Sequence, residues 1–378
     1  MWLNPPEFLR SRYLCYAAVY LFFIGLSSSA LGHSNPYETT VNVVSYGGAY
    51  TKSQMLAYVR PWEAATGKVA NMIDYAGGLD EIKSQVESAN VTWDVVDIEL
   101  ANLINACSAG LLEPTDLSLI ENGADGTPAS EDIPQDYMYD CGYPSVIWST
   151  VIGYNENAFD GDKPSTVSDF FNVEKFPGNR GLRRSPAGLL EWALISDGVA
   201  PADVYSVLST PQGVDYALDI ASVLKPHIVW WSGGGEPAEM LSSGRVSMST
   251  AWNGRLYGPI VDQGQPLGII WDRQMIEVEF WAIPKGSPRI ENAKDFIRFA
   301  MQTENMANQT KHISYGPVRN SAQSLIEDAV KPYLPTSNLD TAFKVDSEWW
   351  AQNMEHINAS FEKWLTPKPE EIERQVRF

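Results

Sequence analysis

The chain is poor in the residues that build metal sites and basic surfaces. Its 378 residues include four histidines and three cysteines, and none has the spacing of a metal-ligand motif. Lysine and arginine number 27 against 47 aspartates and glutamates, which gives a formal net charge of −20. Such an acidic balance argues against nucleic acid and anionic membranes as partners. We therefore expect no bound metal and no nucleic-acid function.

Motifs of the common enzyme classes are also missing. The sequence contains no Gly-x-Ser-x-Gly elbow, no phosphate-binding loop and no dinucleotide fingerprint. The glycine run at residues 233–235 lacks the lysine and the spacing of a nucleotide loop. These absences favour a protein that has no cofactor and is not an enzyme.

Long apolar runs are scarce, and the clearest one lies near the start of the sequence. Residues 13–26 follow Arg10 and Arg12 and precede the small residues 27–32. The run is shorter than the roughly 20 residues that a membrane-spanning helix needs. The pattern predicts a signal peptide at residues 1–32, cleaved after Gly32 or Ala30, and export to the periplasm. An uncleaved anchor is the alternative.

Two cysteines, Cys107 and Cys141, lie beyond the predicted cleavage site. An even pair in an exported chain predicts one disulfide. Two buried free thiols are the alternative.

Short apolar segments alternate with helix-like segments along the rest of the chain. They predict strands at residues 41–46, 69–75, 93–98, 145–154, 181–184, 246–251 and 275–284. Predicted helices lie at residues 51–66, 80–88, 100–109, 189–196, 213–224, 236–243, 294–302 and 347–365. This alternation predicts an α/β protein with a mainly parallel sheet, helices on both faces and a ligand beyond the carboxyl ends of strands.

The segment at residues 229–255 contains the strongest candidates for ligand contacts. A glycine-rich turn there precedes a helix and offers free backbone N–H groups, and a strand there ends in an aromatic, an amide and a charge. These candidates are Trp231, Ser232 and Gly233 in the turn, and Trp252, Asn253 and Arg255 at the strand end. A strand end of this composition is typical of a binding cleft rather than of a core.

Seven stretches of sequence carry a resemblance to a known family. They are SYGGAY (45–50), WDVVDI (93–98), STVIGYN (149–155), SGGGEPAEML (232–241), TAWNGR (250–255), WAIPKGS (281–287) and YGPVRN (315–320). In this order, after a signal peptide, they resemble the spermidine/putrescine-binding branch of the periplasmic solute-binding proteins of ABC importers.

The resemblance implies a type II periplasmic-binding fold, in which crossing hinge strands join two α/β lobes with the ligand cleft between them. Lobe 1 is expected at residues 33–150 and 280–327, and lobe 2 at residues 151–279 and 328–378. It also implies a monomer that closes on a small solute and delivers it to the permease subunits in the membrane.

The resemblance places further residues around the ligand. Tyr46 takes the place of an aromatic wall residue, Trp252 of a stacking residue, Glu279 of an amine-binding acid and Tyr315 of a second wall residue. The neighbouring Gly47, Gly48 and Trp281 complete the expected site. The sequence departs from the polyamine pattern twice: residues 185–188 contain no acid, and Arg255 stands where another member has an acid.

An arginine opposite a glutamate changes the ligand that the site would accept. A guanidinium in a partly buried cleft favours a carboxylate or phosphonate, whereas Glu279 favours an amine. The expected ligand is therefore a zwitterion, such as an ω-amino acid like 4-aminobutyrate, a betaine or an opine-like conjugate.

Several alternatives stay open at this point. Asp97 and Glu99 are expected to cap the strand end rather than contact ligand. One alternative is that Arg255 pairs with an acid of the protein, which would be Asp262, Asp272 or Glu277. Another is that Arg183 or Arg184, rather than Arg255, binds the anionic group of the ligand. A polyamine-binding protein, and an exported sensor or enzyme on the same fold, are the alternative functions.

Overall fold

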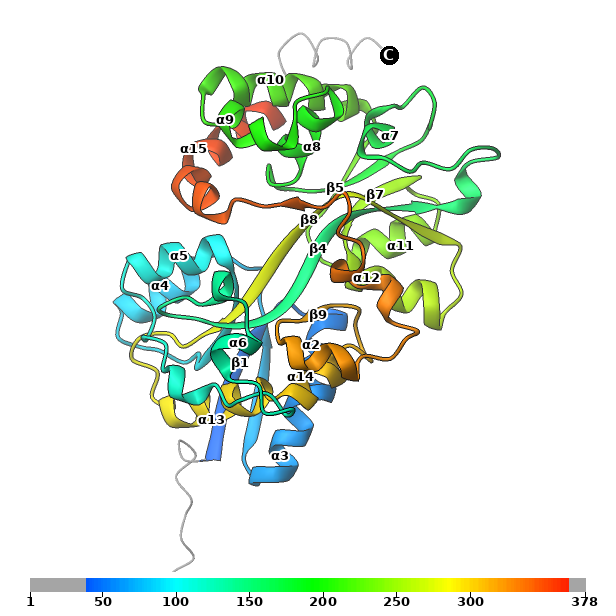
Figure 1. The fold of residues 1–378 in the computed structure, drawn as a ribbon. Coiled ribbons are helices and arrows are strands. Elements are labelled where there is room, and N and C mark those ends of the chain that lie inside the picture. Colours follow the sequence, from blue (N-terminus) through cyan, green and yellow to red (C-terminus); the bar gives the residue numbers. More distant parts are fainter. Residues whose placement is uncertain (1–38, 367–378) are drawn as a thin grey trace, which may run out of the picture. The chain divides into compact units, whose positions relative to one another are not determined.

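The computed structural model describes residues 39–366 as alternating strands and helices (Figure 1). The strands are β1 (Thr40–Ser45), β2 (Val69–Asp74), β3 (Val95–Glu99), β4 (Tyr143–Asn155), β5 (Arg180–Arg183), β6 (Ile228–Trp231), β7 (Met248–Trp252), β8 (Leu267–Ala282), β9 (Gly316–Pro317) and β10 (Phe343–Lys344). The helices are α2 (Gly48–Gln54), α3 (Arg60–Thr66), α4 (Asp80–Glu87), α5 (Leu100–Ser108), α6 (Ala129–Asp132), α7 (Val167–Phe171), α8 (Leu189–Ser196), α9 (Val204–Leu208), α10 (Pro211–Ala221), α11 (Glu236–Ser242), α12 (Asn253–Tyr257), α13 (Ile290–Ala300), α14 (Thr303–Gln309) and α15 (Ser347–Leu365). The predicted α/β class is confirmed, and the predicted signal peptide lies outside the described residues.

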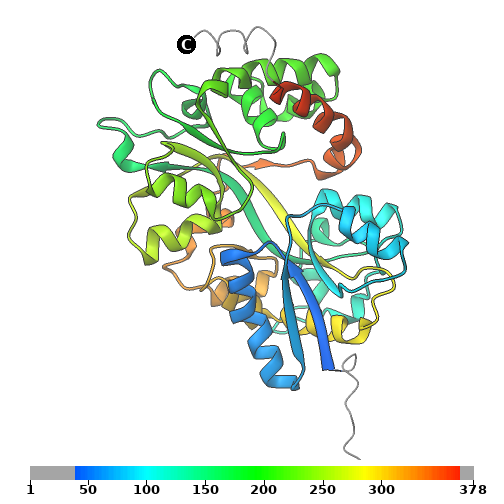
Figure 2. The ribbon, with the colours of Figure 1, turned by 180° about the vertical axis from the view of Figure 1, so that it is seen from behind.

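The strands form one sheet in the order β2-β1-β3-β8-β4-β7-β5-β6, with β9 beside β4 and β10 beside β8. The outer groups are parallel, since β1 pairs with β2 and β3, and β5 pairs with β6 and β7. The long strands β4 and β8 are antiparallel to each other and to their neighbours β7 and β3. The prediction of a mainly parallel sheet is therefore wrong at the centre, because a strand buried on both faces has the same apolar pattern in either direction. Figures 1 and 2 show β4 and β8 side by side between two groups of helices.

The first half of β8 was not expected, because the predicted strand starts at residue 275 and β8 starts at Leu267. The pairing of β8 with β4 shifts register between Thr150 and Ile152. Arg273 has a φ of 52°, which is uncommon for a residue with a side chain. This irregularity interrupts the apolar alternation from which a strand is recognised.

Buried apolar side chains form separate clusters in the segments proposed for the two lobes. One cluster surrounds β1, β3 and α13 and includes Trp62 and Phe296. Another joins α8, α10 and α15 and includes Trp192 and Trp350. A third cluster, which includes Trp148 and Trp252, contains residues of both proposed lobes, so the lobe boundaries stay a prediction.

A disulfide joins Cys107, in α5, to Cys141, just before β4, with Cα atoms 5.9 Å apart. The prediction that these two cysteines pair is confirmed, and the bond ties α5 to the start of a crossing strand. Within residues 39–366, no helix has both the length and the apolar character needed to cross a bilayer.

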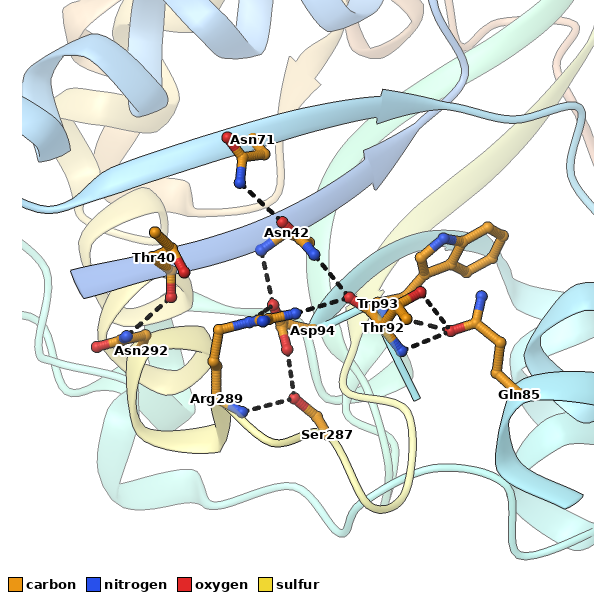
Figure 3. Close-up of polar contacts among 10 residues, drawn as sticks. All are labelled: Thr40, Asn42, Asn71, Gln85, Thr92, Trp93, Asp94, Ser287, Arg289 and Asn292. Carbon is orange, nitrogen blue, oxygen red and sulfur yellow. Dashed lines mark hydrogen bonds and ion pairs between the residues drawn. The ribbon is translucent and has the colours of Figure 1, made fainter. Parts of the chain in front are cut away.

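A buried polar cluster fixes the end of the sheet where β3 begins (Figure 3). The Asp94 carboxylate accepts hydrogen bonds from the Asn42 backbone N–H (2.7 Å), the Ser287 hydroxyl (2.6 Å) and the Arg289 Nε (2.6 Å). Arg289 also donates to the Thr92 carbonyl at 2.8 Å. These contacts join β1, β3 and the segment before α13, so this cluster is a structural tie.

Candidate ligand-binding cleft

Strand ends from distant parts of the sequence line two adjoining cavities. The smaller cavity, of about 20 Å³, is lined by Tyr46, Tyr50, Glu99, Trp148, Trp252, Arg255, Glu279 and Tyr315. The larger, of about 310 Å³, is lined on its polar side by Glu99, Asn102, Arg183, Ser185, Thr250 and Glu277. Glu99 and Trp252 line both cavities. The structure therefore gathers Tyr46, Trp252, Arg255, Glu279 and Tyr315, five of the residues predicted for the site, around one small space.

Arg255 extends from α12 toward the turn that follows β1. Its Nη1 donates to the Gly47 carbonyl at 2.8 Å and its Nη2 to the Tyr46 carbonyl at 3.4 Å. Its side chain is buried, and its Nε has no hydrogen-bond partner among the described residues. Arg255 thus uses main-chain carbonyls, and no acid within residues 39–366 forms an ion pair with it.

Gly47 and Gly48 make room for this contact. Both have positive φ angles, 72° and 59°, which residues other than glycine rarely adopt. A Cβ atom on Gly48 would lie 3.0 Å from Nη1 of Arg255. The glycine pair therefore lets the turn approach the guanidinium closely.

Glu279 lies on β8 opposite Glu99 of β3, in antiparallel register. Its Oε2 accepts a hydrogen bond from Trp148 Nε1 at 2.9 Å, and its Oε1 has no partner among the described residues. Burial raises the pKa of this carboxyl well above its usual range, and the negative charges of Asp97, Glu99 and Glu277 raise it further. An unpaired buried oxygen and a raised pKa suit a group that receives a cation from outside the protein.

Two more acids adjoin Glu279. Glu277 lines the larger cavity, and burial together with the neighbouring Glu99 raises its pKa to about 8. Asp97 lies behind the small cavity, where it accepts hydrogen bonds from Ser45 and Gln54. Burial raises the pKa of Asp97 to about 7. The cleft therefore contains more acid groups than it can keep ionised at neutral pH without an added positive charge.

The Trp252 ring has the guanidinium groups of two arginines close to it. The guanidinium carbon is 5.1 Å from the ring centroid for Arg183 and 5.6 Å for Arg255. Tyr46, Trp148 and Trp231 meet the same ring edge to face. Stacking of the ligand on Trp252 stays a prediction, and cations of the protein already contact this ring.

Other predicted site residues hold the cleft walls. Asn253 accepts a hydrogen bond from the Ser149 N–H and donates to the Ser314 carbonyl at 2.6 Å, which fastens α12 to β4. Trp231 lines the larger cavity, whereas Trp281 packs against Tyr58 in the core and lines neither cavity.

Ser232 and Gly233 of the glycine-rich turn line neither cavity. The N–H groups of Ser232 and Gly233 donate to Oε1 of Glu236, in the first turn of α11. That carboxylate already takes the place that an anionic ligand would occupy at this turn.

Arg183 and Arg184 are adjacent in the sequence, but their side chains have different surroundings. Nη1 of Arg183 lies 3.4 Å from Oε1 of Glu99, in the cleft. Arg184 pairs with Glu362 at 2.9 Å on the exposed surface and lines neither cavity.

Sequence reasoning did not identify Tyr50, Trp148 or Glu277 as cleft residues. Glu277 lies two residues before Glu279 on the same strand, and residues two apart lie on the same face of a strand. This spacing could have identified Glu277 as a second acid of the cleft. Within the described part of the chain, no group of three or more histidine, cysteine, aspartate or glutamate residues is placed to hold a metal ion.

Comparisons with known proteins agree with this architecture. A family model described as bacterial extracellular solute-binding protein matches residues 57–336. The γ-aminobutyric acid-binding protein of Pseudomonas aeruginosa is 35% identical over 353 residues, covering 92% of this chain and 97% of that one.

Two solved structures of Agrobacterium tumefaciens periplasmic binding proteins are also similar. One, from strain R10 with agropinic acid, has a TM-score of 0.77 and 29% identity, covering 86% of this chain and 98% of that one. The other, from strain B6 with glucopine, has a TM-score of 0.79 and 26% identity, covering 87% and 100%. The chain therefore belongs to the bacterial extracellular solute-binding proteins.

Proposed function

We propose that the protein is the periplasmic receptor of an ABC importer and that it binds a small zwitterion, an ω-amino acid of about the size of 4-aminobutyrate. The observation that carries the proposal is that Arg255 and Glu279 line the same small cavity, each with an unpaired polar atom. The relative from Pseudomonas aeruginosa, a γ-aminobutyric acid-binding protein by name, supports the same solute class.

Each end of such a ligand has a counterpart in the cleft. The ligand carboxylate would accept hydrogen bonds from the Arg255 guanidinium, and its ammonium would meet Glu279 among the rings of Tyr46, Tyr50 and Tyr315. A ligand that lacks either end would leave a buried charge unpaired, which costs several kcal/mol. The site should therefore reject both simple amines and simple acids.

Binding requires movement of the side chains that now fill the cleft. A cavity of about 20 Å³ has room for little more than one water molecule. We expect the ligand carboxylate to replace the Gly47 and Tyr46 carbonyls as acceptors for Arg255. Because Arg255 and Gly47 belong to different proposed lobes, this exchange would couple the ligand to opening and closing of the cleft.

The remaining parts of the proposal follow from this role. The receptor would act as a monomer, deliver its solute to permease subunits and perform no chemical turnover. A polyamine is the second candidate ligand, because four acids in and behind the cleft, Asp97, Glu99, Glu277 and Glu279, outnumber Arg183 and Arg255.

Calorimetric titration of refolded, ligand-free protein tests the proposal. Wild type should bind 4-aminobutyrate with a Kd of roughly micromolar or below, and bind putrescine and butyrate far more weakly. Arg255→Met should weaken 4-aminobutyrate binding at least ~30-fold, because it removes one partner of a buried charge pair.

Arg184→Met is the matched control, because it removes an exposed arginine outside the cleft and should leave the Kd unchanged. Binding of putrescine in preference to 4-aminobutyrate would replace the zwitterion with the polyamine.

A further inference from the structure

The two cavities of the cleft adjoin each other, since their linings share residues. Glu99 and Trp252 are the residues common to both linings. Arg183 lines the larger cavity and contacts both of these residues, since its Nη1 is 3.4 Å from Glu99 and its guanidinium carbon is 5.1 Å from the Trp252 ring. The ion pair and the ring therefore include both residues that the two linings share.

The pair also spans the proposed lobes. Arg183 ends β5 and Glu99 ends β3, strands that lie in different groups of the sheet. The side chains are 30% and 19% exposed, so water screens their attraction less than that of a surface pair. Separating them therefore costs more than breaking an exposed ion pair such as Arg184–Glu362.

We propose that the Arg183–Glu99 ion pair, seated on the Trp252 ring, is a partition that limits the length of ligand the cleft accepts. The inference rests on the proposed function of the cleft. A short ω-amino acid stays on the Arg255 and Glu279 side of the partition. A longer one must separate Arg183 from Glu99 to enter the larger cavity.

The larger cavity already holds an acid that suits the longer ligand. Glu277 lines it, while Glu279 lines the smaller one, and both lie on the same face of β8. Residues two apart on a strand are separated by roughly 6.6 Å, a span of about four to five methylene groups, and 8-aminooctanoate has four more than 4-aminobutyrate. With its carboxylate held at Arg255, 8-aminooctanoate could therefore reach Glu277 with its ammonium once the partition is open.

A double variant removes the partition without changing the net charge. Glu99→Gln/Arg183→Met takes away one negative and one positive charge. The double variant Arg184→Met/Glu362→Gln is its control, because it removes an ion pair of the same chemistry from the exposed surface next to β5. Each protein is titrated by calorimetry with 4-aminobutyrate, 6-aminohexanoate and 8-aminooctanoate.

The measured quantity is the ratio of the Kd for 8-aminooctanoate to the Kd for 4-aminobutyrate. We expect a ratio of at least ~100 for wild type and for the control, which corresponds to about 2.7 kcal/mol. In Glu99→Gln/Arg183→Met the ratio should fall at least ~10-fold. A merely structural role for the pair would weaken all three ligands together and leave the ratio unchanged, which would overturn the partition while the proposed function stands.

The same proteins titrated with 1,4-diaminobutane and 1,8-diaminooctane separate the two proposals further. If wild type binds diamines only, with a length limit that the double variant relaxes, the partition stands and the zwitterion ligand falls. If neither series binds to wild type, both fall. Should the double variant fail to fold, Arg183→Met alone gives the same comparison of ratios.

Discussion

Two buried acids near the start of β3, one just before the strand and one in its middle, have very different surroundings. Asp94, just before the strand, has hydrogen bonds on both carboxylate oxygens and an ion pair with Arg289 at 2.6 Å. Asp97, three residues later, is equally buried, but its Oδ1 has no partner among the described residues. Glu279, which lies on β8 opposite Glu99, also has an unpaired oxygen.

The difference separates what holds the fold from what binds solute. A buried charge with all of its hydrogen bonds satisfied stabilises the native state once its partners are present. A buried acid with an unpaired oxygen costs free energy in the unliganded protein. The proposed function gives a reason for this cost, because a ligand cation would offset it at Glu279, on the strand next to β3.

The largest expected effect is on stability and comes from disrupting the hydrogen-bonded cluster around Asp94. Asp94→Asn removes the charge that holds Arg289 and should lower the free energy of unfolding by about 3 kcal/mol, because it leaves a mostly buried guanidinium without its counter-ion. Urea unfolding followed by circular dichroism measures the change. Affinity for 4-aminobutyrate should stay within about twofold at temperatures where the variant is folded. A stability equal to that of wild type would contradict the structural role of the cluster.

Glu279→Gln should have the opposite pattern. The variant loses the ammonium partner, so 4-aminobutyrate should bind at least ~30-fold more weakly, a change of about 2 kcal/mol. Stability should not fall, because the substitution removes a buried acid whose pKa is raised by burial.

The size of the stability change depends on pH. The contribution of a carboxyl with a raised pKa is present below its usual pKa and is lost as pH rises toward the folded-state value. Glu279→Gln should therefore gain stability relative to wild type at pH 8 compared with pH 5. A loss of stability as large as that of Asp94→Asn would mean that the two acids have the same role.

The sequence predicted most of the fold, because apolar periodicity and turn residues mark isolated elements well. Helices 189–196 and 347–365 were predicted with the observed bounds. The sequence did not predict the antiparallel direction of the central strands or the start of β8. Register and antiparallel pairing depend on partners far away in the sequence.

The site was predicted unevenly for a related physical reason. Family resemblance and an unusual charge predicted Arg255 and Glu279 as site residues, and both line the small cavity. The free N–H groups expected at Gly233 are instead occupied by Glu236, and the orientation of a side chain after a turn cannot be read from residue order. Trp148 gave no local signal, since its role depends on where β4 crosses β8.

The smallest expected effect is a dependence of ligand affinity on pH. The pKa values of Asp97, about 7, and Glu277, about 8, and the raised pKa of Glu279 mean that the unliganded cleft holds protons near neutral pH. A ligand ammonium takes the place of a proton, so binding releases a fraction of a proton, and affinity should rise by about tenfold or less in all between pH 6 and pH 8.

Calorimetry in two buffers with different ionisation enthalpies measures the released protons directly. The ligand carboxylate, which would bind the permanently charged Arg255, adds no pH dependence in this range. Glu279→Gln should retain weak binding with a flatter pH profile, because it removes the acid expected to contact the ammonium. An affinity that does not change between pH 6 and pH 8 would mean that the acids of the cleft are already ionised, and the contrast between Asp94 and the acids of the cleft would then rest on hydrogen bonding alone.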